Sequence, residues 1–153
     1  RLSLVGSEMC IRDRSYGNHR GFREAVRVVY DTDKTTFKKL TQFFLDHIDP
    51  TDAGGQFHDR GDSYKTAIYY KDDEEKNIAL SLIEELGASG IYDKSIRVEV
   101  LAEESFYTAE AEHQNYADKN PLRYGMYRQG SGREDFVNNV CAIRDDKKIV
   151  WKD

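Results

Sequence analysis

The amino-acid sequence predicts a domain of the α/β or α+β class, in which helices pack on a β-sheet. Three β-rich segments alternate with two helical ones between residues 25 and 101, an order typical of helices that flank a sheet. The chain has 153 residues, of which 39% are hydrophobic, and this is enough apolar surface for one buried core. The sequence shows no internal repeat, so we expect a single folded unit.

The first predicted strand is followed closely by the first predicted helix. Residues 25–30 form a β-rich run that Arg27 interrupts. Either Thr35 or Thr36 then supplies the N-cap of a helix, and Pro50 prevents that helix from continuing. Four apolar residues at helical spacing form its predicted buried face: Phe37, Leu40, Phe44 and Ile48.

The later elements are predicted from the same kinds of pattern. A strand over 64–70 precedes a helix over 74–86, which ends near Gly87. Residues 96–101 alternate between apolar and polar side chains, as a half-buried strand does. A short helix over 106–119 is stopped by an Asn-Pro pair, and the pattern weakens beyond it.

The two ends of the chain depart from this pattern. Residues 1–14 have no clean period, and residues 2–14 resemble a translated sequencing adapter, so we expect the segment 1–14 to be non-native or disordered. The folded domain is predicted to span residues 15–144. Residues 145–153 are charged, and we expect them to form a loosely attached tail.

Composition narrows the possible partners. The net charge of −5 and the lack of a basic stripe argue against nucleic acid, and no apolar run has the length of a membrane span. The chain has two cysteines, Cys10 and Cys141, which favours a reducing compartment. We therefore expect a cytoplasmic monomer without a nucleic-acid or membrane partner.

The loop over residues 56–65 is the first candidate site. It gathers charged and aromatic side chains around Gly61 and ends where a strand is predicted to begin, a common position for binding groups. The alternative is a solvated turn in which Asp59 and Arg60 form a weak surface pair. The loop alone does not decide between the two.

Two further groups of polar residues are candidates. Glu24, at the start of the first predicted strand, suits a general acid if burial raises its pKa, and otherwise a surface pair with Arg23 or Arg27. The predicted helix over 106–119 places two pairs on shared faces, Glu110 with His113 and Glu112 with Tyr116. Such a helix fits a substrate-facing rim, a metal site or an ordinary capped helix.

The motifs present do not favour a metal or phosphate site. His47, His58 and His113 would have to bind a metal from three separate loops, and neither Cys-x-x-Cys nor His-Glu-x-x-His occurs. The Gly-Ser-Gly run at 130–132 lacks the preceding strand and following lysine of a phosphate-binding loop. No Gly-x-Ser-x-Gly nucleophile elbow occurs either. We expect no metal and no cofactor.

Taken in chain order, these segments resemble the peptide methionine sulfoxide reductase A family. The matching stretches are residues 24–31, 49–51, 58–61, 63–64, 106–110, 113–116, 120–121 and 127–128. The resemblance extends over residues 16–133, in order and at the expected spacing. It implies a two-layer α/β sandwich with a mixed β-sheet flanked by helices.

The resemblance also implies a chemistry. In this family a cysteine thiolate attacks the sulfur of methionine (S)-sulfoxide, in peptides or free, while a buried glutamic acid protonates the departing oxygen. The resulting sulfenic acid is resolved by a second thiol or by thioredoxin, and the product is repaired methionine. By resemblance Glu24 is the acid, Asp59 and Tyr64 line the sulfoxide pocket, and Tyr16 is a second pocket tyrosine.

The chain departs from the family at its thiols. The family nucleophile lies in a Gly-Cys-Phe-Trp motif upstream of the glutamate, and this motif is absent, with Trp151 the only tryptophan. A Cys-Gly-Arg run found in many members is Ser-Gly-Arg at 131–133. This leaves Cys141 as the one candidate resolving thiol, although we favour a buried or bystander role for it. Phe22 also replaces a histidine common in the family. We therefore expect an N-terminally truncated, inactive member that lacks the first strand and the nucleophile segment.

Two other functions remain open. A binding module would recognise oxidised methionine without reducing it, which fits a chain with Glu24, Asp59 and Tyr64 but no matching thiol. A hydrolase would use Glu24, Asp59 and His113 as its acid and base groups, and it rests on the residue types alone.

Overall fold

The computed structural model describes residues 23–147 and Trp151. In chain order its elements are α2 (Phe37–Asp46), β1 (Gly55–Gln56), β2 (Asp59–Arg60), the 3-10 helix η1 (Asp62–Tyr64), β3 (Ala67–Tyr70), α3 (Asp73–Ala88), β4 (Glu99–Ala102), α4 (Tyr116–Lys119), α5 (Pro121–Gly130) and α6 (Arg133–Lys147). The adapter-like segment, Cys10 and Tyr16 lie outside the described residues.

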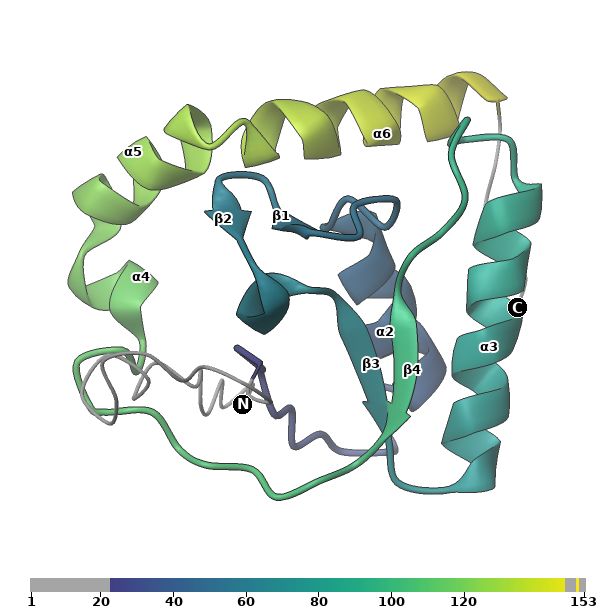
Figure 1. Cartoon of the computed structure of the whole chain (residues 1–153), viewed down its shortest axis with the longest axis horizontal. Helices are drawn as coiled ribbons and strands as arrows, with labels where there is room; N and C mark the ends of the chain where they lie inside the picture. The colour runs from purple at the N-terminus through teal and green to yellow at the C-terminus, as the bar shows by residue number, and fades with distance from the viewer. Residues whose placement is uncertain (1–22, 148–150, 152–153) are drawn as a thin grey trace.

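Helices surround a parallel pair of strands, which confirms the α/β class. β3 and β4 run parallel, with Ala67 opposite Glu99 and Tyr70 opposite Ala102. β1 and β2 pair antiparallel in a separate sheet, so the described strands form two small sheets rather than one mixed sheet. Figure 1 shows α3 along one side of the β3–β4 pair, α6 across one end, and α4 and α5 on the opposite side.

One apolar core joins the elements. It is built from buried side chains of α2, α3, β3 and α6 and of the segments that flank them: Leu45, Ile48, Ile68, Ala79, Leu82, Leu86, Ile91, Val98 and Val140. The presence of Val140 in this set shows that α6, although late in the chain, packs on the same core as the strands. The core therefore holds together segments from the first and last thirds of the chain.

The two predicted core helices are confirmed, and of the two caps predicted for the first helix, Thr36 is the one observed. Thr36 accepts a hydrogen bond from the Lys39 backbone N–H at 3.2 Å and caps α2. Asp72 accepts one from the Glu75 N–H at 2.9 Å and caps α3. Each cap satisfies a backbone donor that has no partner within the helix. The buried residues of α2 are Thr41 and Leu45. The observed buried face is therefore rotated relative to the predicted one, and Phe37 and Phe44 are only partly buried at the edge of the core.

The predicted strands are shorter in the structure. The strand predicted over 25–30 is an extended segment with a single bridge residue, Arg27, because side chains rather than a backbone ladder attach it. The strand predicted over 64–70 begins only at Ala67, because η1 occupies the residues before Lys65. The strand predicted over 96–101 is β4, displaced toward its C-terminal end.

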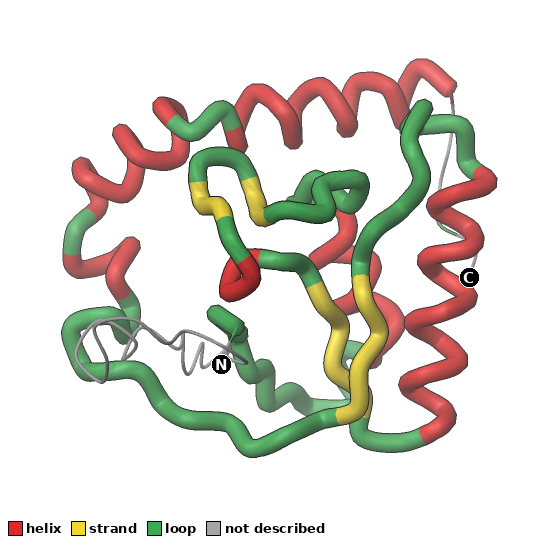
Figure 2. The backbone as a smooth tube through the Cα atoms, in the orientation of Figure 1, coloured by secondary structure: helices red, strands yellow, loops and turns green. Residues whose placement is uncertain are grey.

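The predicted helix over 106–119 is wrong. Figure 2 shows a long loop between β4 and α4, and only Tyr116–Lys119 are helical. Asn115 has a left-handed φ of 54°, and the Gln114 side chain donates to the Ala109 carbonyl at 3.0 Å, so polar side chains compete with the helical hydrogen bonds. The pairs Glu110 with His113 and Glu112 with Tyr116 therefore do not share a helix face.

The C-terminal third is more helical than the sequence pattern predicts. α5 contains no buried residue, and α6 continues to Lys147. Beyond it, the Trp151 indole N–H donates to both carboxylate oxygens of Asp46, at 3.3 and 3.2 Å. Across the described part of the chain, every helix is too short or too polar to cross a bilayer.

Candidate functional site

Glu24 lies in the extended segment that precedes α2 and is held there by its own backbone and by its neighbours. Its backbone N–H donates to the Ser63 carbonyl at 2.9 Å, which ties it to η1. On either side, Arg23 donates to both carboxylate oxygens of Glu99 at 3.0 and 2.9 Å, and Arg27 donates to Glu103 at 2.9 Å. These contacts attach the segment to β4 and fix the position of Glu24.

Burial raises the pKa of Glu24 above its ordinary value of 4.5. A hydrogen bond with the Tyr64 side chain opposes this shift, because it stabilises the ionised carboxylate. The negative charge of Asp59 raises the pKa further, and the nearby His113 lowers it. The residues expected at the site, Glu24, Asp59 and Tyr64, are thus close enough to interact electrostatically or by hydrogen bonding.

The hairpin that carries Asp59 is anchored by a buried amide. The Gln56 side chain accepts from the Asp49 backbone N–H at 2.9 Å and donates to the Asp49 carbonyl at 2.8 Å. Gly55 makes the tight turn possible, since a Cβ there would collide with the Asp59 carbonyl. The hairpin is therefore fixed to the end of the segment that follows α2, and Asp59 with it.

The loop over 56–65 is held by defined hydrogen bonds, although His58, Arg60, Gly61 and Asp62 are exposed. Gly61 has a φ of 119°, which favours glycine, and its N–H donates to the Gly54 carbonyl at 2.9 Å. Arg60 binds Asp52, with Nη2 3.1 Å from Oδ1, and so does not form the alternative surface pair with Asp59. Asp59 is left to face α5.

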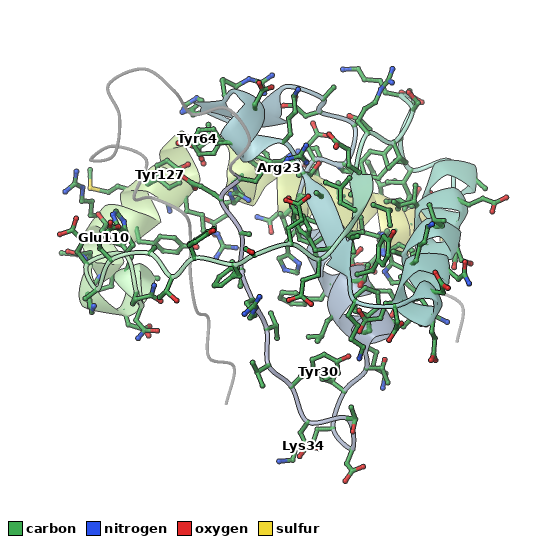
Figure 3. All side chains as sticks on the ribbon, turned by 60° about the horizontal axis from the view of Figure 1, so that its bottom comes forward. Arg23, Tyr30, Lys34, Tyr64, Glu110 and Tyr127 are labelled. Carbon is green, nitrogen blue, oxygen red and sulfur yellow. The ribbon has the colours of Figure 1, made fainter. Side chains whose placement is uncertain are left out.

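Tyr127 is a site residue that the sequence does not reveal. Its hydroxyl donates to the Asp59 carboxylate across 68 residues of sequence. Burial and this hydrogen bond raise the pKa of Tyr127 to about 12. Figure 3 shows Tyr64 and Tyr127 at the same end of the molecule, far from Tyr30 and Lys34. Tyr127 appears in the sequence only as part of a Tyr-Arg match, in a region whose helical pattern is weak.

The N-terminal end of α6 holds the tip of the hairpin. Phe57, at that tip, has a left-handed φ of 54°, which is uncommon for a residue other than glycine. The Arg133 guanidinium lies 4.6 Å from the centre of its ring, and the Phe136 ring packs edge-on at 5.5 Å. Together α5 and α6 therefore bracket the hairpin that carries Asp59.

Other residues singled out in the sequence lie elsewhere. The His47 ring stacks on Phe43 with ring centres 4.1 Å apart, and its Nδ1 lies 2.7 Å from the Phe43 carbonyl. Cys141 is a free, exposed thiol on α6. Within residues 23–147, no three His, Cys, Asp or Glu side chains converge as metal ligands would.

A cavity of about 420 Å³ lies beside the site, but neither Glu24 nor Asp59 lines it. Its lining comprises Arg23, Asp62, Lys65, Tyr69, Leu101, Ala102 and Glu104. Of the residues expected at the site, Glu24, Asp59 and Tyr64, none is among them. Two of its lining residues, Arg23 and Lys65, are the chain neighbours of Glu24 and Tyr64, so the cavity adjoins the candidate site.

The cluster is suited to donating hydrogen bonds to a polar, uncharged oxygen. A protonated Glu24 and the Tyr64 hydroxyl each carry one O–H donor. Because burial raises the pKa of Glu24, its carboxyl keeps its proton to a higher pH than an exposed one does, and a protonated carboxyl is able to transfer that proton when charge develops on the oxygen. The arrangement supports proton donation and, by itself, supplies no nucleophile.

The chain is similar to known proteins over most of its length. A family model described as peptide methionine sulfoxide reductase matches residues 12–144. The peptide methionine sulfoxide reductase MsrA of Bacillus velezensis is 50% identical over 118 residues, which cover 77% of this chain and 67% of that protein. MsrA of Bacillus licheniformis is 44% identical over 131 residues, covering 86% of this chain and 72% of that protein.

Solved structures show the same likeness. The reduced form of Mxr1 from Saccharomyces cerevisiae matches with a TM-score of 0.61 and 30% identity, over 65% of this chain and 54% of that one. Methionine sulfoxide reductase A of Corynebacterium diphtheriae matches with a TM-score of 0.54 and 33% identity, over 65% of this chain and 52% of that one. The match thus spans about half the length of each solved chain.

Proposed function

Since this chain belongs to the peptide methionine sulfoxide reductase family, we propose that Glu24, Asp59 and Tyr64 form its pocket for the oxygen of methionine sulfoxide. The observation that carries the proposal is the contact of Tyr64 with Glu24, whose pKa burial and Asp59 raise. A carboxylic acid and a phenol side by side suit a sulfoxide oxygen, which accepts hydrogen bonds and carries no net charge.

In the proposed reaction, a cysteine thiolate attacks the sulfoxide sulfur while Glu24 gives its proton to the oxygen. The oxygen leaves the methionine sulfur and becomes bonded to the cysteine sulfur, so methionine is released and a sulfenic acid forms. The sulfoxide is reduced and the thiol is oxidised by the same two electrons. Thioredoxin is the proposed reductant of the oxidised thiol.

We further propose that the 153 residues of this chain bind the sulfoxide without turning it over. Cys10 and Cys141 are its two cysteines, and neither stands in a Gly-Cys-Phe-Trp sequence. Glu24 and Tyr64 assist a nucleophile but do not replace one, so the loss of the thiolate is close to fatal for the reaction.

Calorimetry with matched peptides tests the pocket. The peptide with methionine (S)-sulfoxide should bind more tightly than the same peptide with methionine, and Glu24→Ala should lose this preference. Because the protonated acid is the donor, the preference should weaken as the pH rises through the raised pKa of Glu24. Exposed Glu84 on α3 offers the control variant Glu84→Ala. Equal affinity for the two peptides in the unmutated chain would refute the pocket.

A turnover assay tests the missing nucleophile. With dithiothreitol as reductant, the unmutated chain should release no methionine above the background of a heat-unfolded sample. If methionine is released, the variants Cys10→Ser and Cys141→Ser identify the thiol responsible. Activity that one of these substitutions abolishes would show that the chain does carry a nucleophile.

The second candidate function is a binding module for oxidised methionine. The proposed oxygen pocket together with the absence of a Gly-Cys-Phe-Trp motif favours it. Sequencing the genomic DNA upstream of the codon for Ser15 separates the two functions. An open frame that continues into Gly-Cys-Phe-Trp favours the reductase, and its absence favours the module.

The thioredoxin partner, the cytoplasmic location and the monomeric state stay predictions.

A further inference from the structure

We propose that the exposed face of α5 is a docking surface for the chain segment that carries the oxidised methionine, and that it selects segments with an apolar and an acidic residue beside the sulfoxide. The inference rests on the proposed function, since it names the class of peptide that the same site would take. Its own observation is a helix whose apolar side chains face solvent next to the proposed oxygen pocket.

α5 turns large apolar side chains toward solvent. Leu122 is 85% exposed and Met126 is 75% exposed, and the helix contains no buried residue. Because the two lie four positions apart, they share one face of the helix. A surface helix ordinarily packs its apolar face on the core, and a contiguous apolar face left in solvent marks an interaction site. This face is thus open to a partner from outside the described part of the chain.

The apolar face continues into the candidate site. Tyr127 follows Met126 in the chain, and its hydroxyl donates to the Asp59 carboxylate. Figure 3 shows Tyr127 at the same end of the molecule as Tyr64. Tyr127 is itself 43% exposed, so its ring extends the apolar surface from Met126 to the site. A peptide held by its sulfoxide in the proposed pocket therefore has its flanking residues beside α5.

The length of the face matches a short stretch of extended peptide. From Leu122 to Tyr127 the helix rises about 7.5 Å, at about 1.5 Å per residue. An extended chain advances about 3.3 Å per residue, so roughly two residues span the face. The side chains that α5 reaches are therefore those directly next to the sulfoxide, and free methionine sulfoxide has no such neighbours.

Charge decides between a peptide and a second copy of this chain. The two charged residues of α5, Arg123 and Arg128, are both basic, whereas the whole chain has a net charge of −5. A symmetric contact of two copies through α5 would bring these arginines together, and like charges across an interface repel. Arg123 is exposed and shares a helix face with Tyr127, four positions later. An acidic residue beside the sulfoxide complements that charge, and an apolar one complements Leu122 and Met126.

Calorimetry on the full chain tests the apolar part of the surface. Two peptides carry methionine (S)-sulfoxide, one with leucine beside it and the other with serine. The leucine peptide should bind about tenfold more tightly, the effect of burying one apolar side chain. With Leu122→Ser and Met126→Ser together, the two affinities should become equal. Leu80→Ser is the matched control: it removes a side chain that is 46% exposed on α3 and should keep the tenfold ratio.

A second exchange tests the charge. With leucine on one side of the sulfoxide, a peptide with aspartate on the other side should bind more tightly than one with lysine, and added salt should shrink the difference. Arg123→Gln should reduce the difference, and Lys39→Gln, at an exposed position of α2, should not. Lysine bound as tightly as aspartate would contradict the proposed acidic preference. Equal affinity for the leucine and serine peptides in the unmutated chain, or a ratio that survives both serine substitutions, would overturn the docking surface.

Sedimentation of the unmutated chain covers the competing occupant. A dimer that the paired substitutions Leu122→Ser and Met126→Ser dissociate would assign the face to a second copy and overturn the proposal. If this variant does not fold, the amide NMR signals of residues 122–127 are followed in the unmutated chain. They should shift more with the leucine peptide than with the serine peptide, and equal shifts would overturn the proposal. Equal affinity for sulfoxide and methionine within the leucine sequence would refute the oxygen pocket alone.

Discussion

At the scale of single residues, the protonation of Glu24 decides what the site is able to do. Burial raises its pKa, while contact with Tyr64 and with the nearby His113 lowers it. Because the group is only half-buried, solvent screens part of this effect. The balance of these influences is a property of the folded chain, and it disappears on unfolding.

The substitution Glu24→Gln should therefore stabilise the protein at neutral pH. In the native chain the pKa is raised, so the folded state binds the proton more tightly than the unfolded state does. The contribution of Glu24 to stability is full below 4.5 and is lost as the pH rises through the folded pKa. Urea unfolding of both proteins over this range should show a difference that grows with pH and then levels off.

Asp59 provides a check on this interpretation. In Asp59→Asn, one source of the raised pKa is removed, so the advantage of Glu24→Gln at neutral pH should be smaller. A stability difference that does not depend on pH would mean that glutamine changes packing rather than charge. That outcome would contradict a stabilisation that comes from the raised pKa of Glu24.

The sequence identifies part of the site at this scale. Asp59 and Tyr64 are neighbours in one short loop, so their joint motif is visible in the chain itself. Tyr127 lies 68 residues from Asp59, on a helix without a buried face, and no local pattern connects the two. A hydrogen bond between residues so far apart depends on how the helices pack, and the spacing of residues along the sequence does not predict it.

At the scale of elements, α3 depends on the cap at its start. Asp72→Ala should destabilise the protein by about 1 kcal/mol, because the Glu75 backbone N–H loses its side-chain acceptor. Glu84→Ala changes an exposed position in the same helix and should shift stability by less than about 0.5 kcal/mol. Urea midpoints of the two variants give the comparison. Equal losses would show that the cap adds nothing.

The same scale explains which elements the sequence predicts. α2 and α3 have a cap residue and apolar residues at helical spacing, and both were predicted. α6 has Val137 and Val140 buried but little other periodicity, so its helix is stabilised by tertiary contacts that spacing does not reveal. The segment 106–119 has helical spacing, yet its polar side chains bind the backbone and only its end is helical.

At the scale of the whole molecule, the core rests on a small set of side chains. Leu82 is 2% exposed and Leu80, on the same helix, is 46% exposed. Leu82→Ala should cost about 2 to 5 kcal/mol, from lost burial and the cavity left behind, and Leu80→Ala should cost much less. Chemical unfolding of both variants measures the difference. A loss of similar size at both positions would mean that α3 does not pack as described.

The contact between Trp151 and Asp46 joins residues 105 positions apart, and it involves the only tryptophan of the chain. Arg144 lies 4.7 Å from the centre of the indole ring and also binds Asp46 at 2.6 Å. Burial raises the pKa of Asp46, so acid changes the charge directly beside the ring. The emission of this single tryptophan therefore reports the docking of its ring against Asp46 of α2 and Arg144 of α6. Fluorescence selective for tryptophan would follow that docking in real time, without a dye and without signal from the ten tyrosines.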